Sequence, residues 1–126
     1  MQRRYRLVHS RRFQQVYREG RTLVHPLLVM RALANNLAYS RFGFVVSKRI
    51  GHAVVRNRVR RVMREAVRAR IAQLPPRWDL VLIARAPIVR ASFWRIGEAL
   101  DRLLLDLGEA HISRLDPRQN SHSSKI

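Results

Sequence analysis

Apolar side chains recur at helical spacing near the start of the chain. Phe13, Val16 and Tyr17 fall at positions i, i+3 and i+4, which places them on one face of a helix. Ser10 is a suitable N-cap for this helix and Gly20 a suitable end. The pattern therefore predicts a short amphipathic helix between these two residues.

Two longer segments show the same spacing. The first, 54–73, ends before Pro75-Pro76, and the second, 93–107, ends before Gly108. The apolar stripe of the first consists of Val55, Val59, Val62 or Met63, and Ala66. That of the second consists of Phe93, Ile96, Leu100, Leu103, Leu104 and Leu107. Both stripes predict helices with one face in the core.

Three segments are predicted to be strands. Residues 22–33 are rich in Leu, Val and Met, with Pro26 near the start, and 41–47 alternate in polarity. We expect these two strands to pair as a hairpin. Residues 78–86 form the third strand, and 80–84 within it are apolar throughout, which is typical of a strand covered on both faces.

The order of these elements is helix, strand, strand, helix, strand, helix. It predicts an α/β two-layer sandwich of the α+β class, with three helices and a mixed sheet of about four strands, one of them short and not placed by the sequence. Residues 1–110 form one domain in this interpretation. Residues 111–126 are polar and are expected to form a flexible tail.

Composition adds a strong charge imbalance. The 126 residues include 26 Lys and Arg against 8 Asp and Glu, for a formal net charge of +18 at pH 7. Codon bias can replace lysine by arginine, and Lys48 and Lys125 are the only lysines, but such bias does not remove acids. The imbalance therefore indicates a polyanionic partner, either a nucleic acid or an acidic membrane.

Other features narrow the class of protein. Cysteine is absent, which excludes disulfides, zinc–thiolate sites and a cysteine nucleophile. No apolar run approaches the ~20 residues of a membrane-spanning helix, and arginines interrupt the N-terminal segment before a signal-peptide core. We therefore expect a cytoplasmic protein with no membrane partner.

The basic residues are densest in and just before the second predicted helix. Between Lys48 and Arg70, nine basic side chains accompany one acid, Glu65. Like charges on a helix repel by about 0.2–0.5 kcal/mol per close pair, and contacts with phosphates offset such repulsion while releasing counterions. The apolar face of this helix carries Val, Met and Ala, which favours packing on a sheet over binding to a membrane surface.

The residues from Ile50 to Arg64 read Ile-Gly-His-Ala-Val-Val-Arg-Asn-Arg-Val-Arg-Arg-Val-Met-Arg. This order, with Arg-Asn-Arg at 56–58, resembles the signature of the protein subunit of bacterial ribonuclease P. Phe-Gln-Gln-Val-Tyr at 13–17 resembles the opening helix of that family, and the segments 43–49 and 79–85 fall in the expected order. The resemblance covers the chain up to the polar tail.

The resemblance implies a small protein that pairs with a large catalytic RNA, in an enzyme that removes the 5′ leader from precursor tRNA. It also implies a left-handed βαβ crossover. The residues expected to bind the catalytic RNA are Arg49, Arg56, Asn57, Arg58, Arg60, Arg61, Arg64 and Arg68. The residues expected to line a cleft for the single-stranded leader are Arg11, Arg12, Phe13, Tyr17, Met30, Gly43 and Lys48.

Some residues of this cleft have more than one interpretation. The aromatic residues of the first helix are expected to stack on leader bases, although their spacing is also that of a core stripe. Met30 falls where several relatives carry a tyrosine. Phe42 and Phe44 are expected in the core, so that Gly43 faces the cleft and lets the RNA backbone approach.

The sequence offers no convincing catalytic group. The acids before Glu98 are scattered, those of the last helix are typical of a solvated surface, and the histidines lack metal-ligand spacing. We expect the isolated protein to cut nothing and to bind no metal, cofactor or small-molecule substrate, with Mg²⁺ required by the RNA. The alternatives are a non-catalytic ribosomal or RNA-chaperone-type protein and a double-stranded DNA reader that uses Asn57, although a helix-turn-helix partner is missing.

Overall fold

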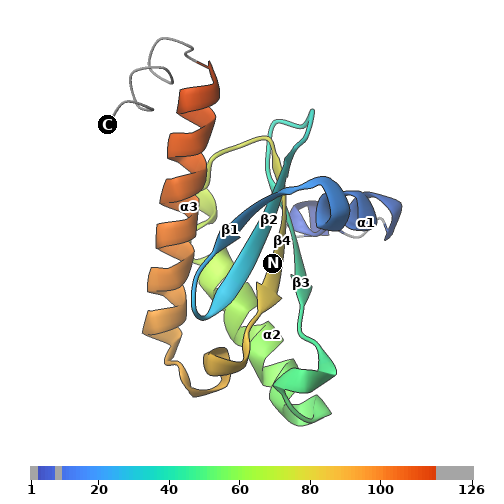
Figure 1. The fold of residues 1–126 in the computed structure, drawn as a ribbon, viewed down its shortest axis with the longest axis vertical. Coiled ribbons are helices and arrows are strands. Elements are labelled where there is room, and N and C mark those ends of the chain that lie inside the picture. Colours follow the sequence, from blue (N-terminus) through green and yellow to red (C-terminus); the bar gives the residue numbers. More distant parts are fainter. Residues whose placement is uncertain (1–2, 8–9, 116–126) are drawn as a thin grey trace.

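A four-stranded sheet with three α-helices makes up residues 3–7 and 10–115, the part of the chain that the computed structural model describes (Figure 1). The helices are α1 (Ser10–Glu19), α2 (Ala53–Arg68) and α3 (Phe93–Leu115). The strands are β1 (Arg21–Val24), β2 (Leu28–Ala34), β3 (Arg41–Val45) and β4 (Trp78–Ala84). The predicted α+β class is confirmed.

The strand order is β1-β2-β4-β3. β2 is antiparallel to both β1 and β4, whereas β3 and β4 are parallel and are joined through α2. The sheet is therefore mixed, as predicted, and contains a βαβ crossover, whose left hand stays a prediction. The N-terminal segment lies beside β3, where the Leu7 N–H donates to the Phe42 carbonyl at 2.8 Å.

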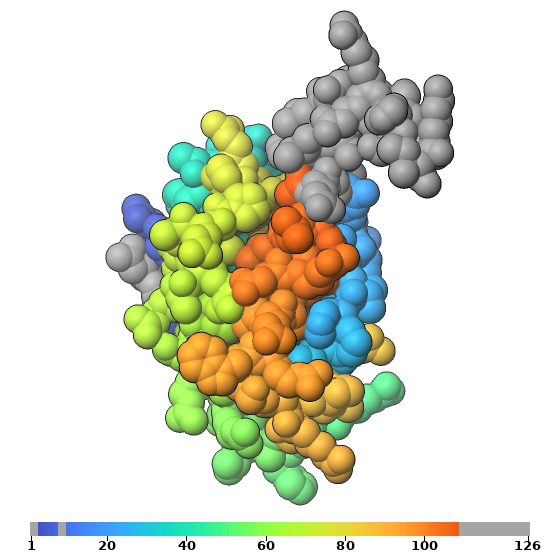
Figure 2. All heavy atoms as spheres, turned by 90° about the vertical axis from the view of Figure 1, so that its left-hand side faces the viewer, coloured from blue at the N-terminus to red at the C-terminus, as the bar shows by residue number. Residues whose placement is uncertain are grey.

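The two faces of the sheet are covered unequally. α2 and α3 pack on one face over the main core, whereas α1 packs on the other face over a smaller cluster (Figure 1). The smaller cluster contains Leu7, Val16 and Val81, with Phe13 and Leu33 against it. α3 lies along the outside of the molecule, with α2 on one side and the β1–β2 hairpin on the other (Figure 2). Because β4 is central and covered on both faces, nearly all of its residues are buried, as its apolar sequence predicts.

The expected pairing of the strands was wrong. The segment 22–33 is not one strand but a hairpin, in which β1 and β2 are joined by a turn at Pro26. Proline has no N–H for the ladder, and the Leu27 N–H instead donates to Nδ1 of His25 at 3.1 Å. β1 is the short strand that the sequence did not place. Because β2 already lies between β1 and β4, β3 pairs with β4 and not with β2.

Two predicted helix ends also differ. α2 ends at Arg68, and a separate 3₁₀ turn spans Ile71–Gln73. α3 continues past Gly108 to Leu115, because a glycine inside a helix costs only about 1 kcal/mol. The helix thus includes the first residues of the predicted tail, and the rest of that tail, 116–126, lies outside the described residues. None of the helices described is both long and apolar enough to span a membrane.

Candidate nucleic-acid interface

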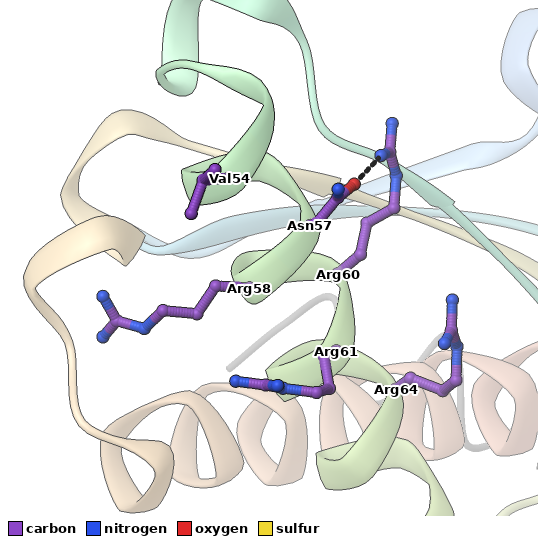
Figure 3. Close-up of a pocket in the computed structure, with 6 residues that line it drawn as sticks. All are labelled: Val54, Asn57, Arg58, Arg60, Arg61 and Arg64. Carbon is purple, nitrogen blue, oxygen red and sulfur yellow. Dashed lines mark hydrogen bonds between the residues drawn. The ribbon is translucent and has the colours of Figure 1, made fainter.

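α2 separates its apolar and basic residues onto opposite faces. Val59, Met63, Ala66 and Val67 are buried against the sheet and α3. The outward side carries the basic face of α2, which consists of Asn57, Arg58, Arg60, Arg61 and Arg64 (Figure 3). The helical period accounts for this separation, because residues three and four positions apart share a face. The apolar stripe therefore faces the core, and the basic residues face outward.

The basic face lines a hollow that is open to solvent. Arg58 and Arg61 point to one side of α2, whereas Arg60 and Arg64 point to the other (Figure 3). Among the described residues, no carboxylate forms an ion pair with any of these four arginines. The hollow therefore presents uncompensated positive charge on both sides of one helix, which suits a phosphate backbone.

The other residues predicted to bind the catalytic RNA lie in different settings. Arg68 pairs with Glu65 at 2.7 Å, and this hydrogen bond lowers the pKa of Glu65. Arg68 therefore offers less free charge than the basic face does. Arg56 has a buried Nε with no partner, while Arg49 is exposed in a 3₁₀ turn before α2. The RNA contacts of these residues stay predictions.

A second hollow lies between α1, β3 and α2, and we name it the leader cleft after the prediction that a leader binds there. It is lined by Arg6, Leu7, Phe13, Phe42, Gly43, Phe44, Arg60 and Arg64. Phe13 and Gly43, predicted to contact the leader, thus share a hollow with Arg60 and Arg64, predicted to contact the catalytic RNA. The two predicted sites are continuous around one side of α2. Sequence reasoning missed Arg6, which the N-terminal segment brings to the cleft by pairing with β3.

Phe13 fills the space that Gly43 leaves. A Cβ added at Gly43 would lie 2.5 Å from Cε2 of Phe13, so only glycine admits the ring at its present position. The prediction that Gly43 lets RNA backbone approach was therefore wrong in its reason, although the residue does line the cleft. On the same helix Val16 is fully buried and Tyr17 is 44% exposed. The stripe of α1 thus combines core and surface positions, with Phe13 between them.

Met30 does not belong to the cleft. It is fully buried in the main core, on the sheet face that α2 and α3 cover. Leu33 belongs instead to the cluster under α1, and Arg31 shares its side of the strand. The prediction for Met30 was wrong because a shift of one residue along a strand reverses the face.

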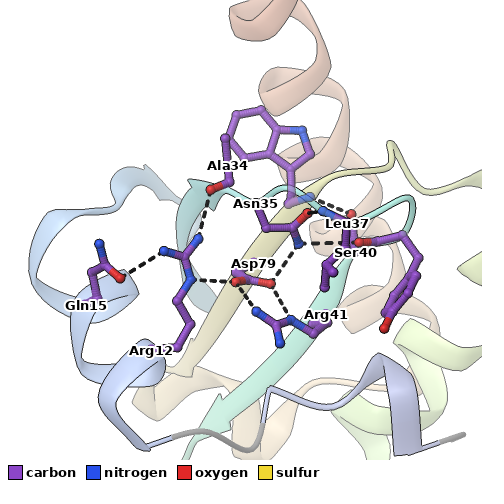
Figure 4. A network of polar contacts seen from close by, with 10 residues as sticks. Arg12, Gln15, Ala34, Asn35, Leu37, Ser40, Arg41 and Asp79 are labelled. Atoms are coloured by element: carbon purple, nitrogen blue, oxygen red, sulfur yellow. Dashed lines mark hydrogen bonds and ion pairs between the residues drawn. The ribbon is translucent and has the colours of Figure 1, made fainter.

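A network of polar contacts centred on Asp79 fixes α1 to the sheet (Figure 4). The side chain of Asp79 is fully buried and accepts hydrogen bonds from Arg12 Nε at 2.7 Å and Asn35 Nδ2 at 2.8 Å. Arg41 donates to both carboxylate oxygens, at 2.8 and 2.7 Å. Burial opposes ionisation, but the hydrogen bonds from Arg41, Arg12 and Asn35 outweigh it and lower the pKa of Asp79. The carboxylate is therefore held as an anion.

This network changes the role of Arg12. Its remaining donors reach the Ala34 carbonyl at 2.8 Å and the Gln15 side chain at 2.9 Å, so its guanidinium is directed inward. The prediction that Arg12 lines the edge of the leader cleft is wrong, because its guanidinium is engaged by Asp79. Arg11, Tyr17 and Lys48 are exposed outside the lining of the hollow, and their contacts with the leader stay predictions. Sequence reasoning considered Asp79 only as a scattered acid. The sequence does contain a signal for this buried role, since Asp79 is the one acid in the apolar strand β4.

The described residues contain no group of three or more His, Asp or Glu side chains that could hold a metal ion. The acids nearest to the basic face and to the network are engaged by arginines, as Glu65 and Asp79 show. The unpaired arginines of the basic face give the site a positive charge that suits a polyanion.

Sequence comparison finds relatives over most of the chain. A family model for Ribonuclease P matches residues 1–108. The ribonuclease P protein component of Roseiflexus castenholzii is 45% identical over 109 residues, which cover 86% of this chain and 89% of that protein. The corresponding protein of Dehalococcoides mccartyi is 45% identical over 107 residues, which cover 85% of each chain.

Solved structures share the fold. A mutant RNase P protein of Staphylococcus aureus with defective mRNA degradation activity aligns with a TM-score of 0.77 at 26% identity, over 83% of this chain and 89% of that one. The RNase P protein of Thermotoga maritima aligns with a TM-score of 0.73 at 34% identity, over 79% and 94%. Sequence and fold agree over the elements that carry the basic face and the leader cleft, and the chain belongs to the ribonuclease P protein family.

Proposed function

We propose that this ribonuclease P protein component binds the catalytic RNA of its enzyme through the basic face of α2 and the 5′ leader of precursor tRNA in the leader cleft. It thereby assists endonucleolytic removal of the leader, which gives the mature 5′ end of the tRNA. The RNA carries out the chemistry with Mg²⁺, and the isolated protein is inactive. Membership of the family makes the chain part of an endoribonuclease complex.

The observation that supports this proposal most directly is the continuity of the two hollows. Arg60 and Arg64 line both the basic face and the leader cleft. A leader strand beside Phe13 would have its phosphates near these arginines, and its bases would have an aromatic ring to stack on. The same helix would carry the catalytic RNA, which brings substrate and catalyst together.

Electrostatics explains how such a protein assists an RNA catalyst. Two RNAs repel each other, and divalent cations screen this repulsion when no protein is present. Unpaired arginines on α2 supply part of the screening, so we expect the protein to lower the Mg²⁺ concentration that the reaction needs. No step of cleavage is assigned to a side chain of this protein.

A cleavage assay at low Mg²⁺ tests the proposal. Precursor tRNA is incubated with the catalytic RNA alone, with the protein alone, and with both. We expect cleavage only when both are present, and activity of the RNA alone at high Mg²⁺. Cleavage by the protein alone would contradict the assignment of chemistry to the RNA, and absence of stimulation would contradict the proposed function.

A further inference from the structure

The start of α3 exposes two aromatic side chains. Trp94 is 79% exposed and Phe93 38%, and their ring centroids lie 5.6 Å apart at an interplanar angle of 50°. Trp78, in contrast, is buried at 4%. Trp94 therefore contributes little to the core, although a solvated indole is costly to leave in water. Neither Phe93 nor Trp94 lines the leader cleft.

The aromatic pair borders a hollow between α3 and the segment that follows α2. This hollow is lined by Ala69, Arg70, Gln73, Phe93, Trp94 and Asp101. Arg70 donates to both oxygens of Asp101, at 2.6 and 3.2 Å, so these two charges of the lining are paired. Arg70 crosses over Gly97, where an added Cβ would lie 2.4 Å from its Nη2. The hollow thus combines a paired arginine and aspartate with an exposed indole.

Exposed basic side chains flank the pair in the sequence. Arg90 and Arg95 are exposed on either side of it, while the exposed acid Glu98 follows Trp94 by one helical turn and Asp101 is paired with Arg70. On α2, which packs against α3, Arg58 and Arg61 point to the side away from Arg60 and Arg64 (Figure 3). An exposed aromatic surface with positive charge around it matches a nucleotide, whose base stacks while its phosphate pairs with arginine.

We propose that the Phe93–Trp94 pair stacks on an unpaired base of the catalytic RNA and is a second RNA contact, separate from the leader cleft. This inference rests on the proposed function, because it extends the binding surface for the catalytic RNA from α2 to the start of α3. The catalytic RNA is the expected source of the base, since α2, which carries the basic face, packs directly against α3, where the pair lies. A second copy of this chain is disfavoured, because it would bring two strongly positive surfaces together.

Direct binding to a transcript of the catalytic RNA tests the contact. Trp94→Ala should weaken binding about tenfold, equivalent to ~1.4 kcal/mol, which lies in the range of one lost stack. Trp94→Phe should retain part of the affinity. Leu105→Ala is the matched control, since Leu105 is a large apolar side chain of the same helix and is 56% exposed. Wild-type affinity of Trp94→Ala, or an equal loss in Leu105→Ala, would overturn the proposal.

Fluorescence provides a second, independent measurement. Because Trp78 is buried, quenching by acrylamide reports mainly on Trp94. Saturating catalytic RNA should protect the fluorescence of the wild-type protein from acrylamide, whereas precursor tRNA alone should not. Unchanged quenching in the complex would overturn the proposal. The proposal would also be overturned if Trp94→Ala changed the sedimentation of the free protein but left its affinity for RNA intact. That result would show that the pair is a surface for self-association.

Failure of this inference is distinguishable from failure of the proposed function. If the wild-type protein stimulates cleavage at low Mg²⁺ but Trp94→Ala binds the catalytic RNA normally, only the second contact is lost. If the wild-type protein neither binds that RNA nor stimulates cleavage, both are overturned.

Discussion

At the scale of single residues, the carboxylate of Asp79 joins segments that are distant in the sequence. Arg12 comes from α1, Asn35 from the end of β2 and Arg41 from β3, and all three donate to the same two oxygens. The arginines retain 23% and 21% exposure, whereas the carboxylate has none. Asp79 thus fixes the position of α1, and with it the aromatic wall of the leader cleft.

Asp79→Asn should lower the free energy of unfolding by about 3 kcal/mol. Removing one partner of a buried ion pair costs about 3–5 kcal/mol, and the partial exposure of both arginines favours the lower end. Urea unfolding followed by circular dichroism measures the change. Asp101→Asn serves as control, because Asp101 is 58% exposed in its pair with Arg70. An equal loss in both variants would show that burial at Asp79 has no special effect.

The same carboxylate predicts how stability depends on pH. The pKa of Asp79 is lowered from its ordinary value of 3.8, so the unfolded chain binds the proton more readily than the folded one. Its contribution is complete above the unfolded pKa and is lost as pH falls through that value toward the folded pKa. Unfolding free energies measured across this acidic range should fall less steeply for Asp79→Asn than for the wild type. High salt in both series screens the exposed Glu65–Arg68 pair.

The position of a residue, buried or exposed, was predictable where the periodicity of a single helix or strand determines it. The exposed arginines of α2 follow from the helical period, and the buried Phe42 follows from alternation in β3. Met30 and Arg12 were not predictable in this way. The first depends on the exact register of β2, since a shift of one residue reverses the face, and the second on an acid 67 residues away in sequence.

At the scale of elements, the arginines of α2 destabilise the helix that carries them. Four arginines of the basic face lack carboxylate partners within the described residues, and they repel one another in the free protein. The buried stripe of Val59 and Met63 holds the helix in place against this repulsion. RNA phosphates would relieve the repulsion, which makes α2 the element that is most sensitive to salt.

Arg61→Ala should weaken binding to the catalytic RNA and reduce its salt dependence. Each lost phosphate contact lowers the slope of log K against log salt by about 0.7–0.9. Arg68→Ala should reduce the slope less, because Glu65 already pairs with Arg68. Affinities measured over a series of salt concentrations provide both slopes. An unchanged slope for Arg61→Ala would remove that residue from the interface.

Element type was more predictable than element pairing. The helices and the buried strand β4 have long periodic or apolar patterns, and the structure contains them close to where the patterns place them. The β1–β2 hairpin was missed because the turn at Pro26 interrupts an apolar run too briefly to be distinguished from one strand. The parallel pairing of β3 with β4 depends on the crossover through α2, which no local pattern encodes.

At the scale of the whole molecule, the sheet separates two packed layers of unequal size. α2 and α3 bury the main core on one face, and α1 covers a small cluster on the other. The leader cleft lies where α1 and α2 come near each other around the edge strand β3. Because the cleft takes one wall from each helix, its binding strength depends on both helices together.

This arrangement predicts coupling between Phe13 and Arg64, which line the cleft from α1 and α2. Phe13→Ala should weaken binding of precursor tRNA to the holoenzyme, and mature tRNA, which lacks the leader, should bind as before. Arg64→Ala should also weaken binding of the precursor, because a leader base stacked on Phe13 has its phosphate near the guanidinium. In the double variant the losses should be less than additive, since neighbouring contacts to one ligand fail together.

The pair Phe13→Ala and Arg61→Ala is the matched control for this cycle. Arg61 carries the same charge on the same helix but points away from the cleft, so its loss should add to that of Phe13 (Figure 3). Dissociation constants for precursor and mature tRNA with the assembled enzyme give both cycles. Additive losses for Phe13 and Arg64 would mean that the leader does not bridge α1 and α2. An equal loss for mature tRNA on Phe13→Ala would assign Phe13 to the support of the fold and not to the leader.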